Sequence, residues 1–168
     1  MMIYENAKDR QQQQLACFQL QRHLGALGIT QISVQETPEH RRECYDAEMH
    51  VHGMWTGVVE VKTRDIDADT LHKWGSILIE TQRVAALAKL FYKRSDVNPS
   101  KRFWNKEVIF LWRLKQDDSC FAINMRRVQE LWHDLEDAPE TLLTDDHGTK
   151  LTGKTGKLIP VESLERIE

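Results

Sequence analysis

The chain has few of the residues that mark specialised protein classes. Its 168 residues include only 4 prolines and 8 glycines, which excludes collagen-like and low-complexity chains. Apolar residues make up 40% of the sequence, too many for a mostly disordered chain. A chain of this length can bury one hydrophobic core and is too short for two comfortable ones. We therefore expect one domain over residues 1–168.

Long apolar runs are missing as well. The longest uncharged ones, such as residues 76–79 and 108–112, fall far short of the roughly 20 residues that cross a bilayer. The first ten residues carry charged side chains such as Glu5 and Asp9 instead of an apolar stretch, so we expect no signal peptide. Three cysteines are too few for a disulfide framework. These absences predict a cytoplasmic protein without a membrane partner.

The sequence also lacks a strong excess of positive charge. Its formal net charge of -3 excludes a polycation that coats nucleic acid through bulk charge, but leaves room for a local basic groove. The strings GxGxxG and GxSxG do not occur in the sequence. Their absence argues against dinucleotide and serine-hydrolase chemistry.

Hydrophobic periodicity predicts alternating helices and strands. Residues 5–27 follow a helical pattern, and a glutamine run within it should face solvent. One face of this helix gathers large apolar side chains: Leu15, Phe18, Leu24 and Leu27. Further strands are expected over residues 29–34, 107–114 and 120–125, and helices over residues 81–94 and 127–136. The first of these helices begins at Thr81 or already near Thr70. The order predicts a mixed α/β domain built on one sheet.

Residues 46–64 have the pattern of a β-hairpin that turns around Gly53. This turn places Asp46 opposite Glu60 and Ala47 opposite Val59. Because side chains alternate along a strand, one face should be apolar, with Ala47, Met49, Val51, Val59 and Val61. The opposite face should carry Asp46, Glu48, His50, Val58, Glu60 and Lys62. Three carboxylates and a lysine would thus share one side of the sheet.

An acid followed two residues later by a lysine occurs once in the chain, in Glu60-Val61-Lys62. Asp46 faces this triplet in the predicted register, and opposed carboxylates repel each other unless a cation lies between them. Asp46 and Glu60 are hard oxygen ligands, and the Val61 carbonyl could complete a partial shell for Mg²⁺ or Mn²⁺. Such an ion activates water for attack on a phosphodiester, and Lys62 could orient that water or neutralise developing charge.

This pattern resembles the PD-(D/E)XK nuclease superfamily, which has the restriction-endonuclease-like fold. The matching residues are Asp46, then thirteen intervening residues, then Glu60-Val61-Lys62, with Tyr45 where the motif name has proline. The resemblance covers about residues 5–125, which leaves residues 126–168 as a C-terminal extension. It implies a mixed α/β sheet flanked by helices, a divalent-metal cofactor and DNA as the substrate.

The resemblance also implies further site residues. In this family a glutamate on the first helix often joins the metal site, and Glu5 or Asp9 would be that acid here. The helix after the lysine strand often offers a Gln or Lys, and Gln82 would take that place. Many relatives act as dimers, which leaves a homodimer open as the assembly.

A groove for nucleic acid needs local cations. Candidates flank the hairpin or lie in the polar loops: Arg41, Arg42, Arg64, Lys73, Lys101 and Arg102. A further phosphate-contacting arm could come from the tail, with Lys150, Lys154 and Lys157. The tryptophans at positions 104, 112 and 132 are expected in the core rather than on a base-stacking surface.

Two alternatives stay open at this point. A zinc site could use Cys44, His50, His52 and His72, although no CxxC or HExxH spacing supports it. The chain could also be a non-catalytic nucleic-acid-binding or assembly module that retains the nuclease fold, because a fold does not fix a function. The sequence does not choose between endonuclease and exonuclease action, or fix the structure of the nucleic acid.

Overall fold

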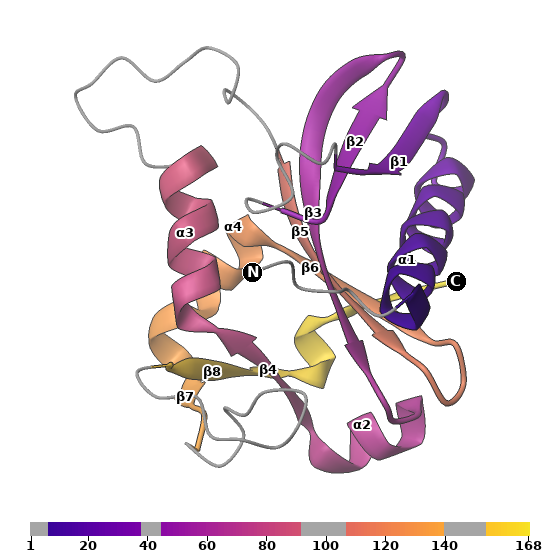
Figure 1. The fold of residues 1–168 in the computed structure, drawn as a ribbon. Helices are drawn as coiled ribbons and strands as arrows, with labels where there is room; N and C mark the ends of the chain where they lie inside the picture. The colour runs from indigo at the N-terminus through magenta and orange to yellow at the C-terminus, as the bar shows by residue number, and fades with distance from the viewer. Residues whose placement is uncertain (1–6, 38–44, 92–106, 140–153) are drawn as a thin grey trace, which may run out of the picture.

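A computed structural model describes residues 7–37, 45–91, 107–139 and 154–168 of the chain (Figure 1). The elements of the first half are α1 (Ala7–Ala26), β1 (Ile32–Glu36), β2 (Ala47–Val51), β3 (Met54–Arg64), α2 (Ala68–Trp74), β4 (Ser76–Glu80) and α3 (Thr81–Phe91). Those of the second half are β5 (Glu107–Leu114), β6 (Cys120–Asn124), α4 (Met125–Leu131), β7 (Glu136–Asp137), β8 (Gly156–Pro160) and β9 (Glu165–Ile167). Short 3-10 helices cover Trp132–Asp134 and Val161–Ser163.

Within the described residues the strands form two sheets. The larger has the order β1-β2-β3-β5-β6-β9, and the smaller has the order β4-β8-β7. In the larger sheet β3 and β5 are parallel and the other neighbours are antiparallel, so the predicted mixed α/β sheet is confirmed. The expectation of one sheet was wrong, because β4 and the C-terminal strand β8 pair separately. No helix in this part of the chain is long and apolar enough to cross a membrane.

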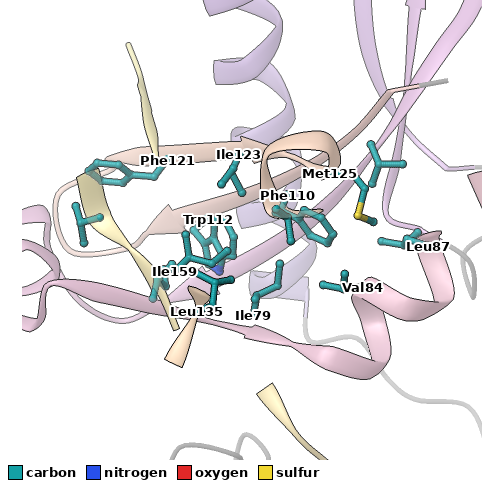
Figure 2. Packing of buried hydrophobic residues seen from close by; sticks show 14 of the residues in the cluster. Ile79, Val84, Leu87, Phe110, Trp112, Phe121, Ile123, Met125, Leu135 and Ile159 are labelled. Carbon is teal, nitrogen blue, oxygen red and sulfur yellow. The ribbon is translucent and has the colours of Figure 1, made fainter. Parts of the chain in front are cut away.

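Each face of the larger sheet is covered by its own core. The helix α1 lies against one face, where Val59 and Val61 of β3 pack with buried residues of the helix. The small sheet, α3 and α4 lie on the other side (Figure 1). Figure 2 shows Phe110 and Trp112 of β5 packed among Ile79 of β4 and the surrounding apolar side chains. Trp112 is a core residue, as predicted, and Trp132 is partly buried against the same cluster.

The buried face of α1 differs from the predicted one. Ala16, Cys17 and Leu20 are buried against the sheet, whereas the larger Phe18 is 55% exposed. Leu15 and Leu27 are exposed as well, and of the predicted stripe only Leu24 packs against the core. Small side chains at positions 16 and 17 let the helix approach the sheet closely. Close packing therefore decides which face of the helix is buried, even though the neighbouring face carries larger apolar side chains.

The glutamine run of α1 is only partly solvated. Gln12 accepts a hydrogen bond of 2.8 Å from Nε of Arg113, whose side chain is almost fully buried on β5. Gln19, one helical turn beyond the run, also accepts a hydrogen bond from this guanidinium. These contacts tie α1 to the sheet, because a buried guanidinium requires acceptors for its donors.

The hairpin has the predicted register near its base. Ala47 pairs with Val59 and Glu48 with Val58, and a shift between Met49 and His50 moves the pairing by one residue towards the turn. The turn residues His52 and Gly53 both have positive φ, 51° and 75°, as a two-residue type I′ turn requires. The predicted apolar face is confirmed for Ala47, Met49, Val59 and Val61, which lie in the α1 core, but not for Val51, which is only partly buried and lies outside that core. Val58 lies in the core on the other side of the sheet.

The segment between the hairpin and α3 contains a helix and a strand that the hydrophobic pattern left undecided. Asp67 caps α2 by accepting a hydrogen bond from the Thr70 backbone N–H, and Gly75 ends this helix with a φ of 78°. The strand β4 follows at once, and α3 begins at Thr81 without an intervening loop. The later helix α4 starts at Met125, two residues before the predicted position, because the Asn124 side chain caps it.

Candidate functional site

The polar face of β3 borders a small pocket, whose free space of about 10 Å³ is enough for roughly one water molecule. Its lining residues are Glu60, Lys62, Arg64, Leu78, Ile79, Glu80, Arg83, Phe110 and Trp112. Glu60, Lys62 and Arg64 alternate along β3 and therefore project from the same face. The pocket thus lies between β3 and β5 on one side and β4 and α3 on the other.

Glu60 is only 4% exposed because its strand is central in the sheet. Arg83 of α3 donates two hydrogen bonds to its carboxylate, from Nε to Oε1 at 2.7 Å and from Nη2 to Oε2 at 2.6 Å. The Lys62 ammonium lies 3.5 Å from Oε1 of the same carboxylate. A buried carboxylate requires such partners, because desolvation of an unpaired charge is costly.

Asp46 lies beside this cluster, immediately before β2. Its Oδ2 accepts a hydrogen bond of 2.7 Å from the Val61 backbone N–H, so its carboxyl is joined to β3 between Glu60 and Lys62. Burial, followed by repulsion from Glu60, raises the pKa of Asp46 to about 7, although the Val61 N–H, Lys62 and Arg83 oppose this shift. Asp46 is not one of the residues that line the pocket. The structure therefore brings the two predicted acids and the lysine together, with Asp46 at the edge of the group.

Gln82 does not join this group. Its side chain is exposed, donates to Thr155 Oγ1 at 3.3 Å and accepts from the Thr155 backbone N–H at 3.1 Å. The next residue, Arg83, contacts Glu60 instead. Sequence reasoning missed Arg83 because the rotation of α3 about its axis is set by its direct junction with β4, which the sequence pattern did not predict.

A third acid, Glu80, ends β4 and lines the same pocket. The Lys154 ammonium lies 3.7 Å from its Oε2, so this predicted tail lysine is beside the pocket. The other tail lysine that is described, Lys157, is held away from it by an ion pair with Asp137 at 2.8 Å.

The predicted nucleic-acid contacts are only partly within the described residues. Arg64 lines the pocket and donates to the Thr63 carbonyl at 2.9 Å, and Lys73 is exposed in the last turn of α2. The remaining predicted site residues lie outside the described part: Glu5, Arg41, Arg42, Lys101 and Arg102. Asp9 lies on α1, but its side chain is also outside that part.

Beyond Asp46, the polar face of β2 carries a second buried acid. Glu48 is 5% exposed, and its Oε1 accepts a hydrogen bond of 2.8 Å from the hydroxyl of Tyr45. The His50 ring nitrogen Nε2 lies 3.8 Å from the other oxygen of Glu48. Tyr45, at the position of the motif proline, thus holds an acid of the polar face in place.

The proposed zinc ligands do not converge. His52 is paired with Gln31 at 2.9 Å in the hairpin turn, and the exposed His72 ring contacts the edge of Phe121. His50 lies beside Glu48, and Cys44 is outside the described residues. Among the side chains that are described, no group of three or more His, Cys, Asp or Glu residues is arranged to hold a metal ion.

The fold has a counterpart among solved structures. It is similar to that of D212, a nuclease from a fusselovirus, with a TM-score of 0.51 and 12% sequence identity, covering 98% of this chain and 89% of that one. At this identity the likeness concerns the fold alone. No protein-family model and no curated protein matches the chain. The mixed α/β architecture is therefore one that a nuclease also has, while membership of the PD-(D/E)XK superfamily stays a prediction.

Proposed function

We propose that the chain is a divalent-metal-dependent nuclease that hydrolyses phosphodiester bonds of DNA. The observation that carries this proposal is the convergence of Asp46, Glu60 and Lys62, which folding of the hairpin brings together beside an open pocket. The similarity of the fold to that of a viral nuclease supports it.

The donor set suits Mg²⁺ or Mn²⁺. Asp46 and Glu60 supply hard carboxylate oxygens from neighbouring strands, and two protein carboxylates suffice for Mg²⁺, which keeps several of its waters. The Val61 carbonyl is the third protein ligand that we propose. Two changes must accompany binding: Asp46 must be ionised, and Glu60 must be released from Arg83. A bound ion would lower the pKa of a water and stabilise charge on the phosphate.

The cationic side chains of β3 would act on the substrate. The Lys62 side chain is partly exposed at the pocket, where its ammonium can orient the attacking water or offset negative charge on the phosphate. Arg64 projects from the same face two residues further along β3 and can contact a flanking phosphate. The two residues would therefore align the scissile bond with the acids.

Replacement of Lys62 tests the catalytic proposal. Lys62→Met keeps most of the apolar stem of the side chain but removes its charge, and we expect cleavage to fall by at least about 100-fold, a loss of about 3 kcal/mol of transition-state stabilisation. The assay uses labelled linear, nicked, flapped and four-way DNA, with RNA for comparison, in Mn²⁺. Lys115→Met, at an exposed position after β5, is the matched control and should retain full activity. Failure of the wild-type chain to cleave any DNA of the panel would contradict the proposal.

A non-catalytic nucleic-acid-binding module is the second candidate. The observation that favours it is the Arg83 fork, which satisfies the buried Glu60 carboxylate without a metal ion. Calorimetric titration separates the two functions. A module predicts DNA binding with no Mn²⁺ binding in either the presence or the absence of DNA, whereas a nuclease predicts that both bind.

A further inference from the structure

We propose that Arg83 is an exchangeable cation, which occupies Glu60 in the resting protein and transfers to a substrate phosphate when a divalent ion takes the carboxylate. This inference rests on the proposed nuclease function and adds a residue and an order of events to it. Metal and nucleic acid would then bind cooperatively rather than independently.

The fork occupies both oxygens of Glu60. They accept short hydrogen bonds from Arg83, at 2.7 and 2.6 Å, so a metal ion that binds both oxygens must displace the guanidinium. Bidentate pairing of this kind is the strong form of the arginine–carboxylate contact. Arg83 and a metal ion therefore compete for the same oxygens.

Withdrawal of Arg83 changes the local charge. Asp46 and Glu60 contribute two negative charges when ionised, and Lys62 and Arg83 contribute two positive charges. With Asp46 ionised the cluster is thus neutral, and it has no net attraction for a divalent cation. Once Arg83 is withdrawn, the same cluster has a net charge of about -1 and attracts such an ion.

The two partners of the fork are unequally buried. The side chain of Glu60 is 4% exposed and requires a cation at all times, whereas that of Arg83 is 24% exposed at the pocket. Released Arg83 can be solvated or can bind another anion, but released Glu60 would be a buried charge with Lys62 as its one remaining cation among the described residues. Opening of the fork is therefore favourable only when another cation replaces Arg83 on Glu60.

A phosphate can become the new partner of Arg83. A guanidinium matches phosphate in the same bidentate manner as it matches carboxylate. Arg83 lines the pocket together with Lys62 and Arg64, so a phosphodiester at the opening of the pocket would lie near three cations. A nucleic-acid phosphate thus supplies the anion that Arg83 loses when Glu60 takes up the ion.

Mn²⁺ binding in the absence of turnover tests this exchange. Free Mn²⁺ is measured by electron paramagnetic resonance, without DNA and with a phosphorothioate DNA duplex whose own binding is subtracted. For the wild-type chain we expect DNA to raise Mn²⁺ affinity at least about tenfold, within the usual range of coupling between two sites. Arg83→Gln should bind Mn²⁺ at least about tenfold more tightly than wild type without DNA, and should lose most of the enhancement by DNA. Its DNA cleavage should nevertheless decrease.

Two further variants keep the test decisive. Arg83→Lys retains a cation beside Glu60 and so protects the fold, but its ammonium cannot form the fork, and its Mn²⁺ affinity should lie between those of wild type and Arg83→Gln. Arg127→Gln removes an exposed arginine of α4 and should behave as wild type. If neither Arg83 variant binds Mn²⁺ more tightly than wild type, the exchange is wrong. Failure of the nuclease proposal would appear separately, as bound Mn²⁺ and DNA without cleavage by wild type.

Discussion

At the scale of single residues, the environment of Asp46 makes the candidate site sensitive to pH. Its carboxyl is half-buried and close to Glu60, and both effects favour the protonated form and raise its pKa to about 7. Between pH 4 and 7 the folded chain therefore holds a proton that the unfolded chain has lost. Asp46 thus favours the folded state at low pH, and this contribution is lost as the pH rises through 7.

Asp46→Asn should remove this pH dependence. Relative to wild type, we expect the variant to be more stable at pH 8 than at pH 5, with a free energy of unfolding that is larger by about 1–2 kcal/mol. One pH unit of change in pKa corresponds to about 1.4 kcal/mol, and partial solvent exposure reduces the full effect. Urea unfolding at the two pH values measures the difference. Asp134→Asn, on the exposed 3-10 helix, should show no such change, and equal behaviour of the two variants would refute the assignment.

Among individual site residues, those on the hairpin could be predicted and those on the helix could not. Alternation along a strand has a period of two, so the register alone placed Glu60 and Lys62 on one face with Asp46 opposite. Successive helical residues point about 100° apart, so the choice between Gln82 and Arg83 depends on how α3 is rotated. That rotation follows from the packing of Val84 and Leu87 into the core and from the junction with β4.

At the scale of elements, Gly57 determines how closely β3 approaches its neighbours. A Cβ at this position would lie 2.5 Å from Cε of Met49 on β2 and 2.6 Å from the backbone carbonyl oxygen of Glu107 on β5. The methionine can move, but the backbone carbonyl cannot without separating the two strands. Gly57 is therefore needed for the parallel pairing that holds the strand of Glu60 and Lys62.

Gly57→Ala should destabilise the protein by about 1–3 kcal/mol, the usual cost of overpacking a well-packed site. Gly25→Ala is a matched control on α1, where a new Cβ would meet nothing within 4 Å. This control should be neutral or should stabilise the helix by roughly 0.5–1 kcal/mol, because alanine is the better helix former. Chemical denaturation of both variants checks the prediction. Equal stability of the two would show that the approach of β3 to β5 does not depend on Gly57.

The undecided segment before α3 contained local signals that periodicity does not detect. Asp67 is followed three residues later by Thr70, whose backbone N–H it caps, and Gly75 supplies the positive φ that ends the helix. The apolar run at positions 76–79 was too short to distinguish a strand from a helix by its pattern. Its pairing with β8, about 80 residues later, decides the matter.

At the scale of the whole molecule, the C-terminal segment joins both sheets. The strand β8 lies between β4 and β7 in the small sheet, and β9 pairs with β6 at the edge of the large one. Ile159 and Ile167 are both buried, one in each hydrophobic core. The strand β8 therefore supports β4, and β4 forms one wall of the pocket.

Truncation after residue 153, which removes β8 and β9, should therefore abolish cooperative folding. It would expose apolar side chains such as Ile77 and Ile79 of β4, and the loss of two strands exceeds the small net stability of a typical domain. Thermal unfolding followed by circular dichroism measures the effect. A truncated chain with an unchanged melting temperature would show that these strands are dispensable.

The sequence by itself determined the features that depend on neighbours along the chain. The hairpin, its two faces and the approach of Asp46 to Glu60 follow from a turn and a period of two, which leave little freedom. Tertiary structure decided the rest: the Arg83 fork, the buried face of α1 and the division into two sheets. These features arise because segments far apart in sequence compete for the same partners, and only the packed chain determines which pairings satisfy the buried charges and exclude water from the cores.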